Sequence, residues 1–272
     1  MSGKLRIGII GCGDFLRLRA ADLLSSRQVE VKLLYSPVNS ANAERYAEIF
    51  GAKAADSPEA IINDPEIDVV CVFVPACVRK EYVLAAAKAG KQIVATKPLA
   101  ADLSDAREMT EAVEQAGVRC GVIYRRTNNP VIEAYKEIFS GGEFGKLALY
   151  KQDWLHHYPT WNRWATDPKK NGGPFMDAML HNLNAARYLM GRRVVGRAFF
   201  SDDHTHSLAC DDTQFLKVDF EQGASAHLFI TWAAELAVYD SAKNDREHID
   251  QCFMVTDQGW LFRNEIREGK AV

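Results

Sequence analysis

The chain lacks several features that would point to particular classes of protein. Among its 272 residues no apolar stretch approaches the length of roughly 20 residues that spans a bilayer. Met1 to Lys4 has no apolar core of the kind found in a secretion signal. The six cysteines form no C-x-x-C pair and are typical of reduced thiols. These absences predict a cytoplasmic protein with no membrane partner.

A strong charge of either sign is also missing. Lys and Arg number 33 against 36 Asp and Glu, so the formal net charge is -3, and no basic run stands out. Nucleic acid is therefore not expected as a partner. There is no internal repeat, low-complexity segment or Gly/Ser linker. With 47% hydrophobic residues, the chain has room for two globular domains of roughly 100 to 200 residues each.

The most informative segment that is present runs from Lys4 to Leu16. Leu5 to Ile10 is a short β-branched run, long enough for a buried parallel strand, and Gly11 and Gly13 follow at once. The first glycine permits a tight turn, and the second lets backbone N–H groups approach a phosphate. A helix expected over residues 14–25 would direct the positive end of its dipole at the same point. The segment predicts a site for a dinucleotide pyrophosphate.

The third position of this glycine fingerprint is Leu16 instead of Gly or Ala. A small residue there normally permits close packing of the helix on the strand. Leu16 therefore weakens the evidence for a dinucleotide-binding turn. The alternative interpretation is an ordinary strand, turn and helix that binds no cofactor. If a dinucleotide does bind, Leu16 predicts a slightly wider spacing between helix and strand, and hence a weaker cofactor grip.

Strand and helix patterns alternate up to residue 124. Parallel-sheet strands and helices in alternation are typical of a doubly wound α/β fold, so residues 1–124 are predicted to form a Rossmann domain that binds NAD(P). The expected strands cover residues 5–10, 29–35, 69–74, 92–95 and 119–124. The expected helices cover residues 14–25, 41–50, 79–89 and 104–115, with another beginning at Ser57-Pro58-Glu59.

The pattern changes in residues 125–272. Two helices are expected there, and short strands joined by turns dominate after residue 193. This part is predicted to be an α+β domain with a largely antiparallel sheet, which would bind the substrate and make subunit contacts. Its expected helices cover residues 130–139 and 174–190, and its expected strands residues 146–153, 194–201, 213–220, 224–232 and 252–256.

Four segments, in this order, carry a resemblance to a known family. They are GIIGCG at 8–13, DVVCVFVP at 68–75, AGKQIVATKP at 89–98, and the run from Gly172 through His181 to Gly191. Together they resemble the Gfo/Idh/MocA oxidoreductases, which include glucose-fructose oxidoreductase and inositol dehydrogenase. The resemblance covers nearly the whole chain. It implies hydride transfer between a nicotinamide cofactor and a secondary alcohol or ketone of a sugar, cyclitol or related polyol.

The Thr96-Lys97-Pro98 triplet resembles the family's Glu-Lys-Pro motif, with Thr in place of Glu. The resemblance implies that Lys97 lies between nicotinamide and substrate and touches both. An ammonium group there can hydrogen-bond the reacting oxygen and stabilise developing alkoxide charge. The alternative is a solvated lysine at a strand end. The missing Glu leaves open how Lys97 is oriented.

Asp177 and His181 are four residues apart in an expected helix, so both side chains would lie on one face. The resemblance makes His181 the acid/base, and an unperturbed histidine pKa of roughly 6.5 suits that role. Asp177 would orient the imidazole or bind a substrate hydroxyl. The alternatives are an exposed pair of no consequence and a metal site. No metal is expected, since hydride transfer needs none when Lys97 carries the electrostatic role.

Three further residues are candidate substrate contacts. Arg126 falls where family members often carry an Arg after the sixth strand, and Tyr124 replaces a frequent Asn two residues earlier. Either residue could instead close the junction between the domains. Tyr158 follows a strand that is expected to approach the site.

The end of the second strand bears on the choice of cofactor. An acidic residue at this place binds the adenosine ribose hydroxyls and repels a 2′-phosphate, but here the position falls on Ser36. Hydroxyl and amide groups nearby can donate hydrogen bonds to a phosphate, although no arginine follows directly. NADP is therefore preferred over NAD. The residues expected to bind the cofactor are Gly11, Gly13, Asp14, Phe15, Ser36, Asn39, Ser40, Pro75, Lys97 and Pro98.

Two other functions stay open. Some relatives keep nicotinamide bound and cleave a glycosidic bond without net redox change, and product analysis with and without added cofactor would reveal this. A non-catalytic NAD(P)-sensing regulator would not need Lys97, Asp177 and His181 together.

The chain stops at Val272, soon after Gly259-Trp260-Leu261-Phe262, whereas similar proteins continue through further strands and a closing helix. The chain is expected to be either a naturally short member or one that lacks part of its second domain. The resemblance implies a homodimer or homotetramer formed through the sheet of that domain.

Overall fold

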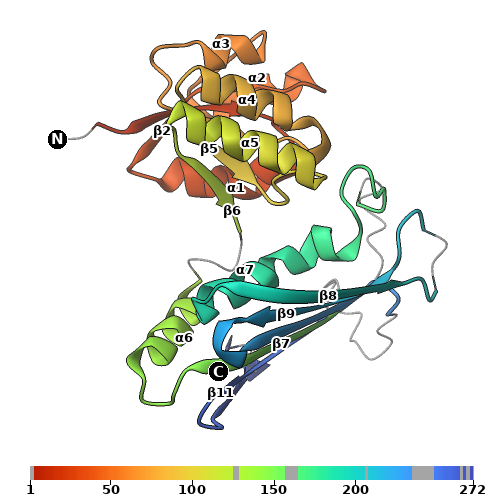
Figure 1. Cartoon of the computed structure of the whole chain (residues 1–272). Coiled ribbons are helices and arrows are strands. Elements are labelled where there is room, and N and C mark those ends of the chain that lie inside the picture. The colour runs from red at the N-terminus through yellow and green to blue at the C-terminus, as the bar shows by residue number, and fades with distance from the viewer. Residues whose placement is uncertain are drawn as a thin grey trace. The chain divides into compact units, whose positions relative to one another are not determined.

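The computed structural model describes residues 3–124, 129–156, 165–205, 208–234, 248–263, 266–267 and 270–271. The chain forms two compact units, Met1–Ile123 and Tyr124–Val272. Each unit has its own six-stranded sheet (Figure 1). Tyr124 belongs to the second unit.

The sheet of the first unit is parallel throughout and has the strand order β3-β2-β1-β4-β5-β6. Its strands are β1 (Leu5–Ile10), β2 (Val29–Tyr35), β3 (Lys53–Ala54), β4 (Val69–Val72), β5 (Gln92–Thr96) and β6 (Cys120–Ile123). The strand order reverses its direction between β1 and β4, which makes this point the topological switch point of a Rossmann sheet. The predicted doubly wound α/β fold is confirmed.

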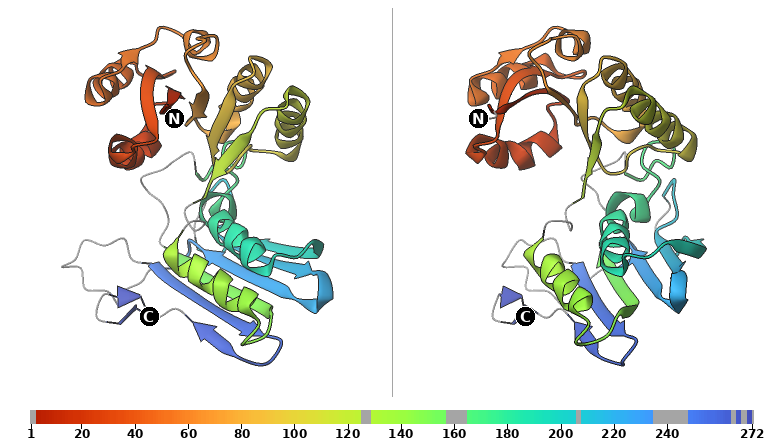
Figure 2. Two further views of the ribbon diagram at one scale, coloured as in Figure 1. Left: turned by 90° about the vertical axis from the view of Figure 1, so that its left-hand side faces the viewer. Right: turned by 60° about the vertical axis from the view of Figure 1, so that its left-hand side comes forward.

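Helices cover both faces of this sheet (Figure 2). Ile9 of β1 belongs to a buried cluster that also contains Leu16 and Tyr46 of the helices on one face, while Ile10 belongs to a cluster on the other face. The alternation of side chains along a strand places these two neighbours on opposite faces. The helices are α1 (Asp14–Ser25) and α2 (Ser40–Phe50) on the first face, and α3 (Pro58–Ile62), α4 (Lys80–Lys88) and α5 (Leu103–Ala116) on the second.

Leu16, the residue that departs from the glycine fingerprint, is fully buried. It lies on α1 in the same hydrophobic cluster as Ile9, Val31 and Leu34 of the sheet. The large side chain therefore fills the core between helix and sheet, which accounts for leucine at this position. The wider spacing and weaker cofactor grip that Leu16 predicts stay predictions.

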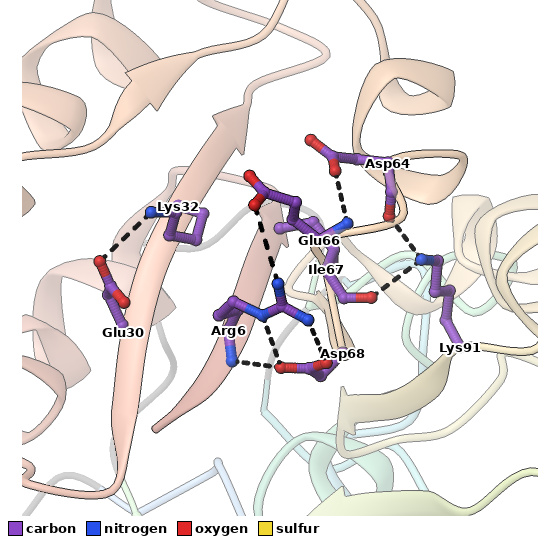
Figure 3. Close-up of polar contacts among 8 residues, drawn as sticks. All are labelled: Arg6, Glu30, Lys32, Asp64, Glu66, Ile67, Asp68 and Lys91. Atoms are coloured by element: carbon purple, nitrogen blue, oxygen red, sulfur yellow. Dashed lines mark hydrogen bonds and ion pairs between the residues drawn. The ribbon is translucent and has the colours of Figure 1, made fainter. Parts of the chain in front are cut away.

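A group of charged side chains holds the amino ends of the strands together (Figure 3). Asp68, just before β4, accepts hydrogen bonds from the backbone N–H of Arg6 at 2.8 Å and from its guanidinium at 2.9 and 3.1 Å. The side-chain hydrogen bonds from Arg6 are the main reason that the pKa of Asp68 is lowered to about 2. Lys91, just before β5, donates to the carbonyl of Ile67 at 2.8 Å. These contacts lie at the end of the sheet opposite to the glycine turn.

The second unit is an α+β fold with a mixed, mostly antiparallel sheet of order β12-β11-β7-β10-β9-β8, as predicted. Only β10 and β7 pair in parallel within this sheet as the structure describes it. The strands are β7 (Leu147–His156), β8 (Val194–Asp202), β9 (Thr213–Phe220), β10 (Ser225–Thr231), β11 (His248–Thr256) and β12 (Leu261–Arg263), with a separate pair β13 (Ile266–Arg267) and β14 (Lys270–Ala271).

Two helices pack on one face of the second sheet, namely α6 (Pro130–Gly141) and α7 (Leu180–Met190) (Figure 1). Phe139 and Leu189 of these helices share a buried cluster with Leu228 and Met254 of the strands. The strand β8 at the sheet edge is more open, and Phe199 and Phe200 are 51% and 60% exposed there.

Replacing Leu16 by Ala is expected to lower the free energy of unfolding by about 2–5 kcal/mol, because it leaves a cavity in a core that is otherwise close-packed. Urea denaturation of the purified chain measures this change. Leu18→Ala is the matched control, since Leu18 lies on the same helix and is 59% exposed. The control should cost less than about 0.5 kcal/mol. Equal losses in both variants would show that Leu16 is not a core residue.

Candidate active site

The carboxyl ends of four neighbouring strands, β2, β1, β4 and β5, meet along one edge of the first sheet. Neighbouring strands are about 4.8 Å apart, so the segments that follow them lie side by side. All ten residues predicted to bind the cofactor lie in these segments: Ser36, Asn39 and Ser40 after β2; Gly11, Gly13, Asp14 and Phe15 after β1; Pro75 after β4; Lys97 and Pro98 after β5. In open α/β sheets, ligands bind outside this edge at the switch point.

Gly11 is required by the protein itself. Its φ of +108° is unfavourable for other residues, and an added Cβ would lie 2.7 Å from the carbonyl carbon and oxygen of Phe73. Its N–H donates to the carbonyl of Tyr35 at 2.8 Å. The turn is therefore held closely against the end of β2 and the segment that follows β4.

Gly13 differs, because no contact with the residues that the structure describes demands a glycine there. It is exposed, its φ is -95°, and an added Cβ would meet nothing within 4 Å. It also stands at the N-cap of α1, where backbone N–H groups lack helical partners. The open space beside these donors fits the close approach of a phosphate, which only a residue without a side chain permits.

The residues around the two glycines are fixed by local contacts. The ring of Phe15 packs edge-on against Phe73, with their centroids 4.8 Å apart. Asp14 is exposed and forms an ion pair with Arg17 at 3.3 Å. Cys12 is buried, and desolvation raises the pKa of its thiol to about 11, so the thiol is protonated at neutral pH. Thiolate chemistry is therefore not expected in this turn.

The end of β2 carries hydroxyl and amide groups in place of an acid. The Oγ of Ser36 accepts from the N–H of Asn39 at 3.4 Å, and the Oδ1 of Asn39 accepts from the N–H of Ala41 at 3.1 Å, which caps α2. These contacts engage the oxygens as acceptors. The Ser36 hydroxyl hydrogen and the Asn39 amide hydrogens are donor groups that an anion can use.

Sequence reasoning missed Arg79, which lies between the short helix η1 (Ala76–Val78) and α4. Its side chain is 1% exposed and donates to backbone carbonyls and one hydroxyl near the ends of β4 and β5. The hydroxyl is that of Thr96, at 2.6 Å from Nη2. The carbonyls are those of Val74 at 2.6 Å, Thr96 at 2.8 Å, Leu99 at 3.0 Å, and Pro98, which is also in hydrogen-bond contact.

Arg79 is a buried cation without a carboxylate partner among the described residues. Desolvation lowers the pKa of Arg79 to about 10, so the guanidinium is still charged at neutral pH. Hydrogen bonds to a charged group contribute about 1.5–3 kcal/mol each, and here they compensate for the loss of water. Nε makes no hydrogen bond within the described part of the chain. No sequence motif signals this arrangement, because most of the partners are carbonyl oxygens.

In the second unit, the expected helix over residues 174–190 contains a π turn, η2 (Phe175–Met179), ahead of α7. The N–H of Leu180 reaches the carbonyl of Phe175, five residues earlier. Asp177 lies within this wider turn and His181 in the α-helix that follows it, so the predicted helix is not α-helical throughout. The N–H of Phe175 donates to Gln214 of β9 at 2.8 Å, which fixes the start of the turn on the sheet. Single π turns are frequent at functional sites.

Neighbouring side chains contact both predicted catalytic side chains of this unit. Asp177 is partly buried, and its Oδ1 accepts from Nδ2 of Asn171 at 3.1 Å; Asn171 itself is fully buried. His181 is 9% exposed, and its ring packs edge-on against that of Tyr124 with centroids 6.1 Å apart. Burial raises the pKa of the Tyr124 phenol, and the charge of Arg187 partly opposes this. Neither side chain is therefore exposed, in contrast to the alternative of an exposed pair.

The structure therefore brings together the cofactor candidates in the first unit, and Tyr124 with His181 in the second. Lys97 belongs to the first unit, and Asp177 and His181 belong to the second. The candidate substrate contacts Arg126 and Tyr158 lie outside the described residues.

The described part of the chain has neither a metal-binding cluster nor a membrane-spanning helix. No group of three or more His, Cys, Asp or Glu side chains there is arranged to hold a metal ion. No helix there is long and apolar enough to cross a membrane.

The strand order and the glycine turn at the switch point define the first unit as a dinucleotide-binding Rossmann unit. Residues 5–124 match the family model described as "Oxidoreductase family, NAD-binding Rossmann fold". Residues 132–246 match the "GFO/IDH/MocA C-terminal domain". The chain belongs to the GFO/IDH/MocA family of oxidoreductases, as its motifs predict.

Relatives of the chain include two inositol dehydrogenases. The scyllo-inositol 2-dehydrogenase (NAD(+)) of Bacillus subtilis is 29% identical over 71% of this chain and 56% of its own length. The myo-inositol 2-dehydrogenase of Thermotoga maritima is 27% identical over 98% of this chain and 78% of its own length. The chain thus spans little more than half of the length of the first relative.

A solved structure supports the fold. The WlbA dehydrogenase from Bordetella pertussis, in complex with NADH and UDP-GlcNAcA, has a TM-score of 0.82 at 18% identity. The similarity covers 98% of this chain and 74% of that one.

Replacing Gly13 by Ala is expected to weaken NADH binding at least 10-fold, a loss of about 1.4 kcal/mol, because the methyl group occupies the space that the phosphate needs. The free energy of unfolding should change by less than about 1 kcal/mol. Nicotinamide fluorescence titration and urea denaturation measure the two effects. Gly121→Ala is the control, since Gly121 also has open space and lies away from the turn on β6. Unchanged NADH affinity in Gly13→Ala would exclude a phosphate at this turn.

Proposed function

We propose that this chain is an NAD(P)-dependent dehydrogenase or reductase that acts on a secondary alcohol or ketone of a sugar, cyclitol or related polyol. The observation that carries the proposal is the position of Lys97, directly after β5 on the sheet edge that also carries the glycine turn. A cation there can act on a substrate beside the nicotinamide of a dinucleotide anchored at Gly13. The two inositol dehydrogenases among the relatives support the substrate class.

In the proposed reaction, the bound nicotinamide supplies the hydride acceptor or donor. Lys97 Nζ hydrogen-bonds the reacting oxygen and stabilises its negative charge as the C–H bond breaks. His181 takes the hydroxyl proton in the oxidising direction and returns it when a ketone is reduced. Asp177, held by Asn171, orients the imidazole or binds a substrate hydroxyl. Tyr124, Arg126 and Tyr158 are proposed to contact the substrate.

Replacing Lys97 by Met is expected to lower turnover at least 100-fold, because one preorganised donor to the developing oxyanion is lost. The reduced nicotinamide formed with scyllo-inositol, myo-inositol and a panel of sugars is measured by its absorbance. Dinucleotide affinity should change little, since the main contribution of Lys97 is to the transition state.

Lys88→Met is the matched control for this variant, because Lys88 is exposed at the end of α4, before β5, whereas Lys97 follows the carboxyl end of that strand. It should turn over like the wild type. Full activity in Lys97→Met would remove Lys97 from the mechanism. Absence of net nicotinamide reduction, with cleavage of a glycosidic bond, would instead favour the glycosidase alternative.

For the cofactor, we propose a preference for NADP over NAD. The segment after β2 offers donors from Ser36 and Asn39 and no carboxylate that would repel a 2′-phosphate. The NAD-binding family model and the NADH complex of WlbA support a nicotinamide dinucleotide and do not distinguish this preference.

Parallel titrations with NADPH and NADH test the preference. NADPH should bind more tightly, and raised salt should weaken it more than NADH, because the extra phosphate interaction is electrostatic. NADH binding at least 10-fold more tightly than NADPH, a difference of about 1.4 kcal/mol, would reverse the proposal.

The homodimer or homotetramer expected through the second sheet stays a prediction. The exposed aromatic side chains of Phe199 and Phe200 on β8 are consistent with the packing of another subunit against this strand.

A further inference from the structure

The guanidinium of Arg79 joins segments that each border a residue of the proposed site. Val74, whose carbonyl accepts from Nη2, directly precedes Pro75. Thr96, which accepts through both its carbonyl and its hydroxyl, directly precedes Lys97. The carbonyls of Pro98 and Leu99, directly after Lys97, accept from Nη1. One buried side chain thus holds the backbone on both sides of the proposed catalytic lysine.

We propose that Arg79 is a positioning residue that places Lys97 for hydride transfer, and that the Thr96 hydroxyl completes its set of acceptors. This inference rests on the proposed function of Lys97. It answers how the lysine is oriented when threonine stands in place of the glutamate of the Glu-Lys-Pro motif.

The long side chain of Lys97 makes its ammonium sensitive to the position of the backbone. Four methylene groups carry the ammonium, so its position depends on how firmly the backbone is held. The carbonyls of Thr96 and Pro98 flank Lys97, and both accept from the same nitrogen of Arg79. A buried guanidinium is rigid and planar, so it fixes several acceptors in one geometry. Small displacements of a catalytic group cost large factors in rate, and such a fixed geometry prevents them.

The hydroxyl of Thr96 is the side-chain acceptor in this arrangement. Nη2 has two N–H groups, and its two acceptors are the Val74 carbonyl and the Thr96 hydroxyl, each at 2.6 Å. Thr96 is 8% exposed, so water is not freely available to replace its hydroxyl. Removing the hydroxyl alone would leave one buried N–H of a charged group unpaired, and serine would preserve the contact.

Amide hydrogen exchange tests the positioning contact without any assay of activity. In Arg79→Met, peptides covering residues 96–100 should exchange at least 10-fold faster than in the wild type, while peptides of β1 should keep their rates. Arg107→Met is the control, because Arg107 is exposed on α5. Unchanged exchange at residues 96–100 in Arg79→Met would overturn the proposal.

Two milder variants of Thr96 test the same contact if Arg79→Met does not fold. Thr96→Val should accelerate exchange in the same peptides, and Thr96→Ser should restore the wild-type rates. Thr110→Val is the matched control, since it removes an exposed hydroxyl on α5. Equal exchange in the valine and serine variants of Thr96 would contradict the assigned role of its hydroxyl.

Kinetics then decide whether the contact positions Lys97 for catalysis. Arg79→Met should lower kcat roughly 10- to 100-fold and change the KM for the dinucleotide by less than about 2-fold. Thr96→Ser should keep a kcat close to that of the wild type. A wild-type kcat in a variant with faster exchange would overturn the positioning role. If the wild-type chain turns over no polyol, the proposed function fails, and the exchange rates still decide whether Arg79 holds the segment around Lys97.

Discussion

The parallel pairing of β1 with both β2 and β4 is the constraint on which the proposed site depends. It places the glycine turn between the ends of two neighbouring strands, where a Cβ on Gly11 would lie 2.7 Å from the Phe73 carbonyl. Only glycine allows this approach at a φ of +108°. Because all strands of this sheet point the same way, the segments after β2, β4 and β5 meet the turn at one edge. The polar contacts of Arg6 and Asp68 stabilise the opposite end and leave this edge for a ligand.

Glycine thus stands at positions 11 and 13 for different physical reasons. Gly11 is demanded by the protein, since both its backbone conformation and its neighbours exclude a side chain. Among the described residues nothing restricts Gly13 in this way, and its exposed position at the N-cap of α1 leaves open space beside backbone N–H groups that lack helical partners. A glycine that folding does not require, at a place where a phosphate can approach, is evidence for a binding function. This distinction needs the coordinates, because both residues look alike in the motif.

Much of the fold could be predicted because its signals are local. Ser57 caps α3 as its Ser-Pro-Glu sequence indicates, and Gly51 ends α2 with a left-handed φ of +64°. The π turn at Asp177 could not be predicted, because an i→i+5 hydrogen bond has no clear sequence signature. Arg79 was missed for a related reason. Its partners lie up to 20 residues away and are mostly backbone carbonyls, which every sequence has.

The sequence by itself determined the two fold classes, the order of their elements, and the family to which the chain belongs, because periodicity, glycine positions and motif order are properties of the chain. Only the tertiary structure decided why Leu16 is tolerated and what holds the segment around Lys97. Burial and hydrogen bonding depend on which distant segments meet. Leu16 is a defect in a glycine fingerprint, yet it is a core residue in the folded unit. Arg79 belongs to no sequence motif. Its guanidinium is buried away from water and therefore needs hydrogen-bond acceptors, and those acceptors lie near the ends of β4 and β5.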